Sequence, residues 1–185
     1  MFTASSFRSL GVFGAALVAV LLTRLLPHWP NFTAVGAFAL GSAVWFNGSR
    51  WSGIVALAGL YATDLILSNT VYASVTGWTW GYSGMVWTYS AWALLVVLGQ
   101  WVPSNGKIGR WTALAAAGSA VFFVLTNTGS WLGSPLYPQT ATGLGTALWA
   151  GLPFAGSFFA ATWLYGVAYA AVSRSILPAM GAAKA

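Results

Sequence analysis

Very little of this sequence can carry a charge or bind a metal ion. Its 185 residues include no cysteine, one histidine (His28) and one acidic side chain (Asp64). The lack of cysteine excludes disulfides, thiolate metal sites and a cysteine nucleophile. A single acid excludes an aspartic dyad, and one histidine cannot by itself build a structural zinc site. We therefore expect neither a bound metal nor a cofactor.

Charge of either sign is scarce, whereas apolar residues are abundant. Charged residues make up 4% of the chain and hydrophobic residues 58%. A soluble domain of this length carries about a quarter charged residues. The composition therefore predicts an integral membrane protein. The seven Lys and Arg residues are scattered singly and form no basic patch, so the net charge of +6 indicates no nucleic-acid partner.

Long apolar runs predict the fold. A helix that spans the bilayer needs about 20 mainly apolar residues, and six such runs are separated by Pro, Gly, Asn and Ser. We predict a single all-α domain over residues 1–185. Its six transmembrane helices are expected at about 9–27, 32–47, 51–69, 83–103, 110–127 and 154–177.

The ends of two of these helices need separate predictions. The first run ends in "TRLLPHWP" without a small-residue cleavage site, so we expect an uncleaved helix and not a signal peptide. The Gly- and Pro-rich stretch 128–153 looks too interrupted for a span. There we expect a loop with a short interfacial helix at about 141–150.

The basic residues predict how these helices are oriented. With the N-terminus in the cytoplasm, Arg24 is the only basic residue on the outer side, and this is a strong positive-inside bias. Both termini should then face the cytoplasm, in a multi-pass protein of a bacterial cytoplasmic (inner) membrane. The basic residues on the inner side are Arg8, Arg50, Lys107, Arg110, Arg174 and Lys184.

Asp64 is expected to form an ion pair. It lies about 13 residues into the third predicted helix, near the membrane depth of Arg24. A charge at this depth costs at least ~2.5–3.5 kcal/mol, so it normally has a partner. We predict that Asp64 pairs with Arg24. Two interpretations stay open: the pair only holds two helices together, or it lines a cavity that opens to the outside.

Other polar and aromatic residues gather at the same outer end. The stretch "GWTWGYSGMVWTY" is dense in aromatic rings. Such rings are typical both of a platform for a flat ligand and of an interfacial anchor. The candidate substrate-binding residues are Arg24, His28, Asp64, Asn69, Tyr72, Trp87, Tyr89, Asn127 and Trp131.

One motif resembles that of an enzyme. Residues Gly81 to Gly84 spell GxSG at the start of the fourth predicted helix, where rhomboid proteases carry their nucleophile. Ser83 would need a histidine to accept its proton. In rhomboids this histidine comes from the sixth helix, but here no histidine follows His28. We therefore predict that the protein is not an enzyme.

Five segments of the chain stand out together: "RLLPHWPNFTAVGAFAL", "YATDLILSNTVYA", "GMVWTYSAWALLVVLG", "VFFVLTNTGSWL" and "YPQTATGLGTALWAGLPF". They resemble an uncharacterised family of six-helix bacterial membrane proteins that is grouped with the S-components of energy-coupling factor (ECF) transporters. The resemblance implies an S-component-like bundle that captures a small vitamin-like micronutrient in an outward-facing pocket. The loops between helices one and two, three and four, and five and six would close over this ligand.

The resemblance also implies partners. S-components dock a membrane coupling subunit, which works with ATPases, through an Ala-xxx-Ala stripe on the first helix, and Ala15 and Ala19 match this pattern. His28 and Asp64 occupy places similar to those in cobalamin-specific S-components, so cobalamin or a related corrinoid is one candidate substrate. Those proteins use a cysteine as the cobalt ligand, and this chain has none.

The function expected from the sequence is a substrate-binding membrane subunit for vitamin uptake. The alternative is a structural or accessory subunit of a larger membrane complex. A transporter should contain an outer cavity of roughly 300–1,000 Å³. In an accessory subunit, its own side chains should fill that region.

Overall fold

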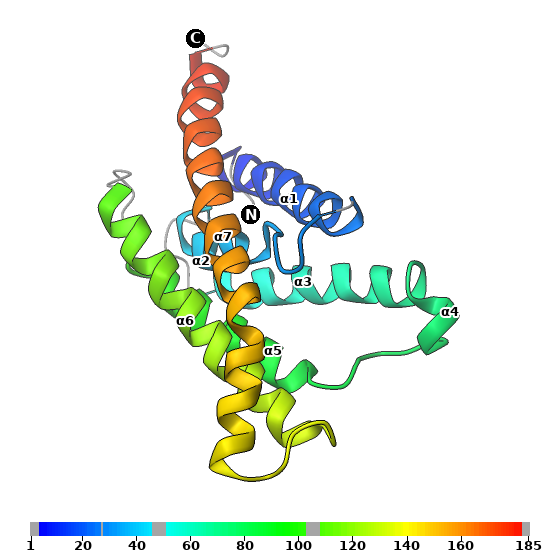
Figure 1. Cartoon of the computed structure of the whole chain (residues 1–185). Coiled ribbons are helices and arrows are strands. Elements are labelled where there is room, and N and C mark those ends of the chain that lie inside the picture. Colours follow the sequence, from blue (N-terminus) through cyan, green and yellow to red (C-terminus); the bar gives the residue numbers. More distant parts are fainter. Residues whose placement is uncertain (1–3, 27, 46–50, 103–107, 183–185) are drawn as a thin grey trace.

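The computed structural model describes residues 4–26, 28–45, 51–102 and 108–182 (Figure 1). Within these ranges the chain forms seven helices and no strand, so the predicted all-α fold is confirmed. The helices are α1 (Ala4–Leu25), α2 (Val35–Trp45), α3 (Ser52–Asn69), α4 (Ala73–Thr76), α5 (Met85–Gly99), α6 (Ile108–Gly133) and α7 (Ala141–Ala182).

Three helices are long and apolar enough to cross a membrane. They are α3, α6 and the segment Ala141–Ala171 of α7. Shorter apolar helices cover Phe13–Leu25 in α1 and Met85–Gly99 in α5. Together with the near absence of charge, these helices indicate a membrane protein, as the composition predicted.

Helix α2 lies at the centre of the bundle. It contacts α1, α3, α5, α6 and α7, and residues 34–43 are all buried. A helix that is surrounded on all sides must be apolar all round, which its sequence "VGAFALGSAVW" satisfies. Its 11 residues rise only about 17 Å at ~1.5 Å per residue, which is shorter than the hydrocarbon core. Of the span predicted at 32–47, Val35–Trp45 form this short helix enclosed by the bundle, and 46–47 lie outside the described residues.

Glycines let the other helices approach α2 closely. A Cβ at Gly99 of α5 would collide with the main-chain carbonyl of Leu40. On α2 itself, Gly36 leaves the space that the Thr162 and Phe158 side chains of α7 occupy. Small residues at helix crossings of membrane proteins have this role.

The prediction for residues 128–153 holds in part: a loop covers 134–140 and a helix begins at Ala141, but that helix is long. Helix α6 continues to Gly133, and α7 runs without a break from Ala141 through Pro153 to Ala182. A proline within a helix costs about 3 kcal/mol, because a hydrogen bond is lost and the ring clashes with the preceding turn. Packing of α7 along α6 offsets this cost. The C-terminal part of α7 extends past the other helices (Figure 1).

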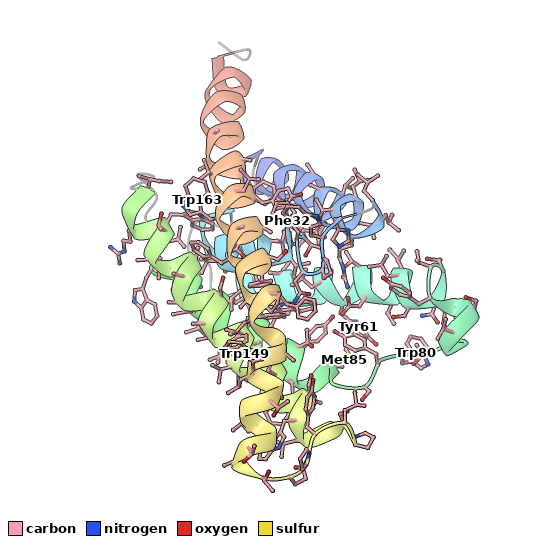
Figure 2. All side chains as sticks on the ribbon, viewed as in Figure 1. Phe32, Tyr61, Trp80, Met85, Trp149 and Trp163 are labelled. Carbon is pink, nitrogen blue, oxygen red and sulfur yellow. The ribbon has the colours of Figure 1, made fainter. Side chains whose placement is uncertain are left out.

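Hydrogen bonds from two tryptophan side chains join α6 to α7. The Trp111 indole donates a hydrogen bond of 3.2 Å to the carbonyl of Trp163. The Trp163 indole in turn donates to the Thr112 hydroxyl at 2.8 Å. Gly166 leaves room for the Trp111 ring. Figure 2 shows Trp163 where α7 passes the first turns of α6.

Candidate ligand-binding cavity

A cavity of about 690 Å³ lies between the C-terminal end of α1, α3, α5 and the α6–α7 pair. Its volume falls within the range of about 300–1,000 Å³ that is typical of small-molecule sites. Hydroxyl and amide groups are frequent in its wall. The polar lining residues, the Trp92 indole aside, are Arg24, His28, Asn31, Thr33, Asp64, Ser68, Tyr72, Tyr82, Thr88, Thr126, Asn127, Ser130 and Tyr137.

The predicted ion pair forms part of this wall. The Arg24 Nη2 and Asp64 Oδ1 atoms lie 2.5 Å apart, which confirms the predicted pairing. Asp64 is 4% exposed and Arg24 is 20% exposed. The other terminal nitrogen of Arg24 donates to the Thr63 hydroxyl at 2.8 Å. The guanidinium is therefore held by two neighbouring residues of α3.

Two tyrosines complete the surroundings of the carboxylate. The Tyr89 hydroxyl donates to Asp64 Oδ2 at 2.7 Å, and the Tyr82 hydroxyl donates to the same oxygen at 3.3 Å. Partial burial and the charge of Asp64 raise the pKa of Tyr82 to about 12, so this phenol remains a donor at neutral pH. Asp64 thus binds one cation and two hydroxyl groups.

Aromatic rings form the apolar part of the wall. Phe122 of α6 and Phe158 of α7 stack with ring centroids 4.2 Å apart and an interplanar angle of 7°. Phe154 lies one turn before Phe158, and Trp92 of α5 also borders the cavity. A flat ring system could stack against such a surface while its edges reach the polar groups.

Asn127 reaches the cavity between α6 and α7. Its side-chain nitrogen donates to the carbonyl of Phe123 at 2.8 Å. The amide lies directly against Gly151 of α7, where a Cβ would collide with it. Gly151 therefore creates the space for this amide, and both residues line the cavity.

The connection from α1 to α2 forms another side of the cavity. It contains a turn in which Phe32 N–H donates to the Trp29 carbonyl at 2.9 Å. Asn31 in this turn has a φ of 61°, a left-handed conformation that asparagine tolerates better than most residues. The His28 Nδ1 atom lies 2.6 Å from the Leu26 carbonyl, which can only accept. Nδ1 must then carry a proton, and in a neutral ring Nε2 is an acceptor.

The structure brings several of the predicted binding residues together. Tyr89 contacts Asp64 but does not border the cavity. Figure 2 shows that Tyr61 of α3 points toward the start of α5, and its ring lies 6.3 Å from that of Tyr89. The predicted residues that line the cavity are Arg24, His28, Asp64, Tyr72 and Asn127.

Asn69 lies outside the cavity wall and shapes a loop. Its side-chain nitrogen donates to the carbonyls of Leu65 and Thr79, at 3.0 and 2.9 Å. The Thr79 N–H donates back to the Asn69 side-chain oxygen at 2.8 Å. This reciprocal pair holds the loop before α5 against the end of α3.

Trp87 and Trp131 also lie outside the cavity wall. The Trp87 side chain packs on Gly129, where a Cβ would overlap it, and so fits α5 against α6. The Trp131 indole donates to the Pro138 carbonyl at 2.8 Å and closes the loop between α6 and α7. Their role in ligand binding stays a prediction, and the contacts described for them are packing and loop contacts.

Most of the aromatic residues that line the cavity were not among the predicted binding residues. Aromatic residues in an apolar helix give no signal of their own. Helical spacing does: Phe122, Thr126 and Ser130 lie four residues apart on one face of α6, and Ala150, Phe154 and Phe158 do so on α7. A polar group that recurs every four residues in a membrane helix would have indicated the α6 face.

Other candidates lie away from the cavity. Trp78 and Trp80 are 72% and 67% exposed, with centroids 5.8 Å apart, which favours the interfacial-anchor interpretation of this loop (Figure 2). On α1, Ala15 is exposed and Ala19 is half-buried.

The serine of the enzyme-like GxSG motif, Ser83, does not line the cavity. No cluster of His, Asp or Glu that could hold a metal occurs in the described part of the chain.

Comparison with known proteins identifies a family. Its model matches residues 5–179, so the chain belongs to the family of unknown function DUF6580. Searches of curated proteins and of solved structures found no match. The function must therefore be argued from the cavity.

Proposed function

We propose that this protein is the substrate-binding membrane subunit of an uptake system, similar to an ECF S-component, for a small vitamin-like micronutrient. The cavity is the observation that carries the proposal. Its volume of about 690 Å³ and its combination of stacked rings, hydroxyls and amides suit a small organic molecule. The loops around the cavity are the ones that, from the resemblance to S-components, we expected to surround a ligand.

The alternative of an accessory subunit has less support. In that case the region around Arg24 and Asp64 should be filled by the protein's own side chains. Instead, the Asn127 amide and the Ser130 hydroxyl of α6 border open space. Placing polar groups in a helix bundle is costly unless they meet a partner or water. A ligand that enters from water provides such a partner.

The proposal includes a topology. Six apolar segments cross a bacterial inner membrane, both termini face the cytoplasm, and the cavity opens to the outside. The support is the charge distribution, in which Arg24 is the one basic residue assigned to the outer side. Helix α7, with 42 residues or about 63 Å, is long enough to cross the hydrocarbon core and continue beyond it.

The proposal also includes partners and a substrate class. The sequence contains no P-loop, so active uptake would need a coupling subunit and ATPases, and the face of α1 with Ala15 and Ala19 is the proposed docking site. A corrinoid is much larger than the drug-sized ligands that fit cavities of this volume, and the chain has no cysteine for cobalt. A smaller vitamin is the better candidate.

The test is to identify small molecules that co-purify with the protein. Protein from its native membrane is denatured and the released compounds are measured by mass spectrometry. Thr126→Trp would place an indole inside the cavity, beside the ring-lined wall, whereas Val124→Trp places the same ring on the half-exposed outside of α6. We expect one compound with the wild type and with Val124→Trp but not with Thr126→Trp. No compound, or the same compound in all three, would favour the accessory subunit.

A further inference from the structure

The charges around the cavity cancel. Among the lining residues, Arg24 and Asp64 are the groups with a permanent charge, and they bind each other. The His28 imidazole also lines the cavity, with its Nδ1 atom 2.6 Å from the Leu26 carbonyl. An ionised ligand would therefore find no unpaired countercharge in the wall.

Both members of the pair are also occupied by hydrogen bonds. Asp64 accepts from Tyr82 and Tyr89 in addition to Arg24. The Arg24 guanidinium donates to Thr63 as well as to Asp64. A cationic ligand would have to displace a donor from Asp64, which is 4% exposed, and the adjacent carboxylate offsets the attraction of Arg24 for an anionic ligand.

The groups that remain available are neutral. The Asn31 and Asn127 amides and the Ser130 hydroxyl can both donate and accept, whereas the Thr126 hydroxyl donates its proton to the Phe122 carbonyl and is left as an acceptor. Together with the stacked rings of α6 and α7, they match a planar molecule with polar edges. We propose that the cavity takes an uncharged planar ring compound with hydrogen-bonding groups and rejects carboxylates, phosphates and amines of the same shape.

This inference rests on the proposed function, and it narrows the substrate class. Its physical basis is the cost of removing an ion from water. An ionised group in a low-dielectric site is unfavourable unless a countercharge and hydrogen bonds replace its hydration. A neutral amide or hydroxyl loses far less hydration and recovers it from the amides and hydroxyls of the wall.

Three probes of nearly identical shape test the inference. Benzamide is neutral, benzoate is an anion and benzamidine is a cation, and each is a planar substituted benzene. Binding to the purified full-length protein is measured by ligand-observed NMR titration. We expect benzamide to bind at least about tenfold more tightly than either ion, or about 1.4 kcal/mol. Binding should persist in Val124→Trp and be lost in Thr126→Trp.

A change of charge in the cavity wall should change which of the three probes binds most tightly. Asp64→Asn leaves the Arg24 guanidinium without its counterion, so benzoate should now bind more tightly than benzamide. His28→Gln should leave the ranking of the three probes unchanged. If Asp64→Asn does not fold, the ranking in the wild type still decides the question.

The outcomes separate the inference from the proposed function. Cavity-dependent binding of benzoate or benzamidine to the wild type as tight as that of benzamide would overturn the inference and leave the proposed function standing. If none of the three probes binds in a way that Thr126→Trp abolishes, the cavity is not a site for ring compounds. That result would overturn the inference, and with it the support that the cavity gives to the proposed function.

Discussion

Arg24 and Asp64, 40 residues apart in the sequence, meet at 2.5 Å where the end of α1 passes α3. This contact joins two helices and also forms part of the cavity wall. Within the described residues it buries the chain's single carboxylate, which is 4% exposed. The stability of the bundle and the chemistry of the cavity therefore depend on the same pair.

Removal of either partner should destabilise the protein. Asp64→Asn or Arg24→Met leaves one charge without its counterion, and we expect a loss of roughly 3 kcal/mol, the lower end for buried pairs, because Arg24 is partly exposed. The double variant should lose less than the sum of the two single variants. Thermal unfolding in detergent measures all three. Strictly additive losses would show that the pair contributes no coupling.

The two tyrosines that donate to Asp64 should contribute unequally to the stability of the protein. Tyr89→Phe removes a hydrogen bond of 2.7 Å to a carboxylate, for which we expect a loss of about 1.5–3 kcal/mol. Tyr82→Phe removes a longer bond of 3.3 Å and should cost less. The Tyr61 hydroxyl donates to the Trp80 carbonyl at an exposed site. Tyr61→Phe is therefore the control, and we expect it to have the smallest effect on stability. The same unfolding assay would contradict this account if Tyr61→Phe were the most harmful.

Alanine substitutions at two glycines should change the free energy of unfolding in opposite directions. Gly99→Ala would push a methyl group into the main chain of Leu40, and we expect a loss of about 1–3 kcal/mol. At Gly145 of α7 an added Cβ meets no atom within 4 Å. There Gly145→Ala should stabilise the helix by roughly 0.5–1 kcal/mol. Equal effects at both positions would argue against close packing of α2 on α5.

The proposed orientation can be tested by cysteine labelling, because the natural chain has no cysteine. Val75→Cys on α4 and Gln139→Cys before α7 should react with a membrane-impermeant maleimide in intact spheroplasts. Gly109→Cys at the start of α6 should react only after permeabilisation. These positions are all exposed in the structure. The reverse pattern would place the cavity on the cytoplasmic side.

The sequence predicted the contacts of residue types that are rare in the chain. Asp64 is the only acid, and Arg24 is the only basic residue assigned to its side, so their pairing followed from the cost of a lone charge in the membrane. Asn127 was selected for a similar reason, as an amide at the predicted end of an apolar helix, and it lines the cavity. Such residues are conspicuous against their surroundings.

The sequence was less informative where packing decides the structure. Pro153 suggested a break, but α7 continues because its contacts with α6 outweigh one lost hydrogen bond. Trp87 looked like a ligand platform, and its position depends on the glycine at 129, which lies on another helix. The stacked pair of Phe122 and Phe158 depends on how α6 and α7 are aligned, and no local pattern encodes that alignment.

The proposed function requires that the cavity beside Arg24 and Asp64 holds one small molecule. Native mass spectrometry of protein released from its own membrane detects such a complex. We expect a single small-molecule adduct in one-to-one stoichiometry on the wild type and on Val124→Trp, and none on Thr126→Trp. An unliganded wild type, or an adduct that survives in Thr126→Trp, would show that the cavity is not the binding site.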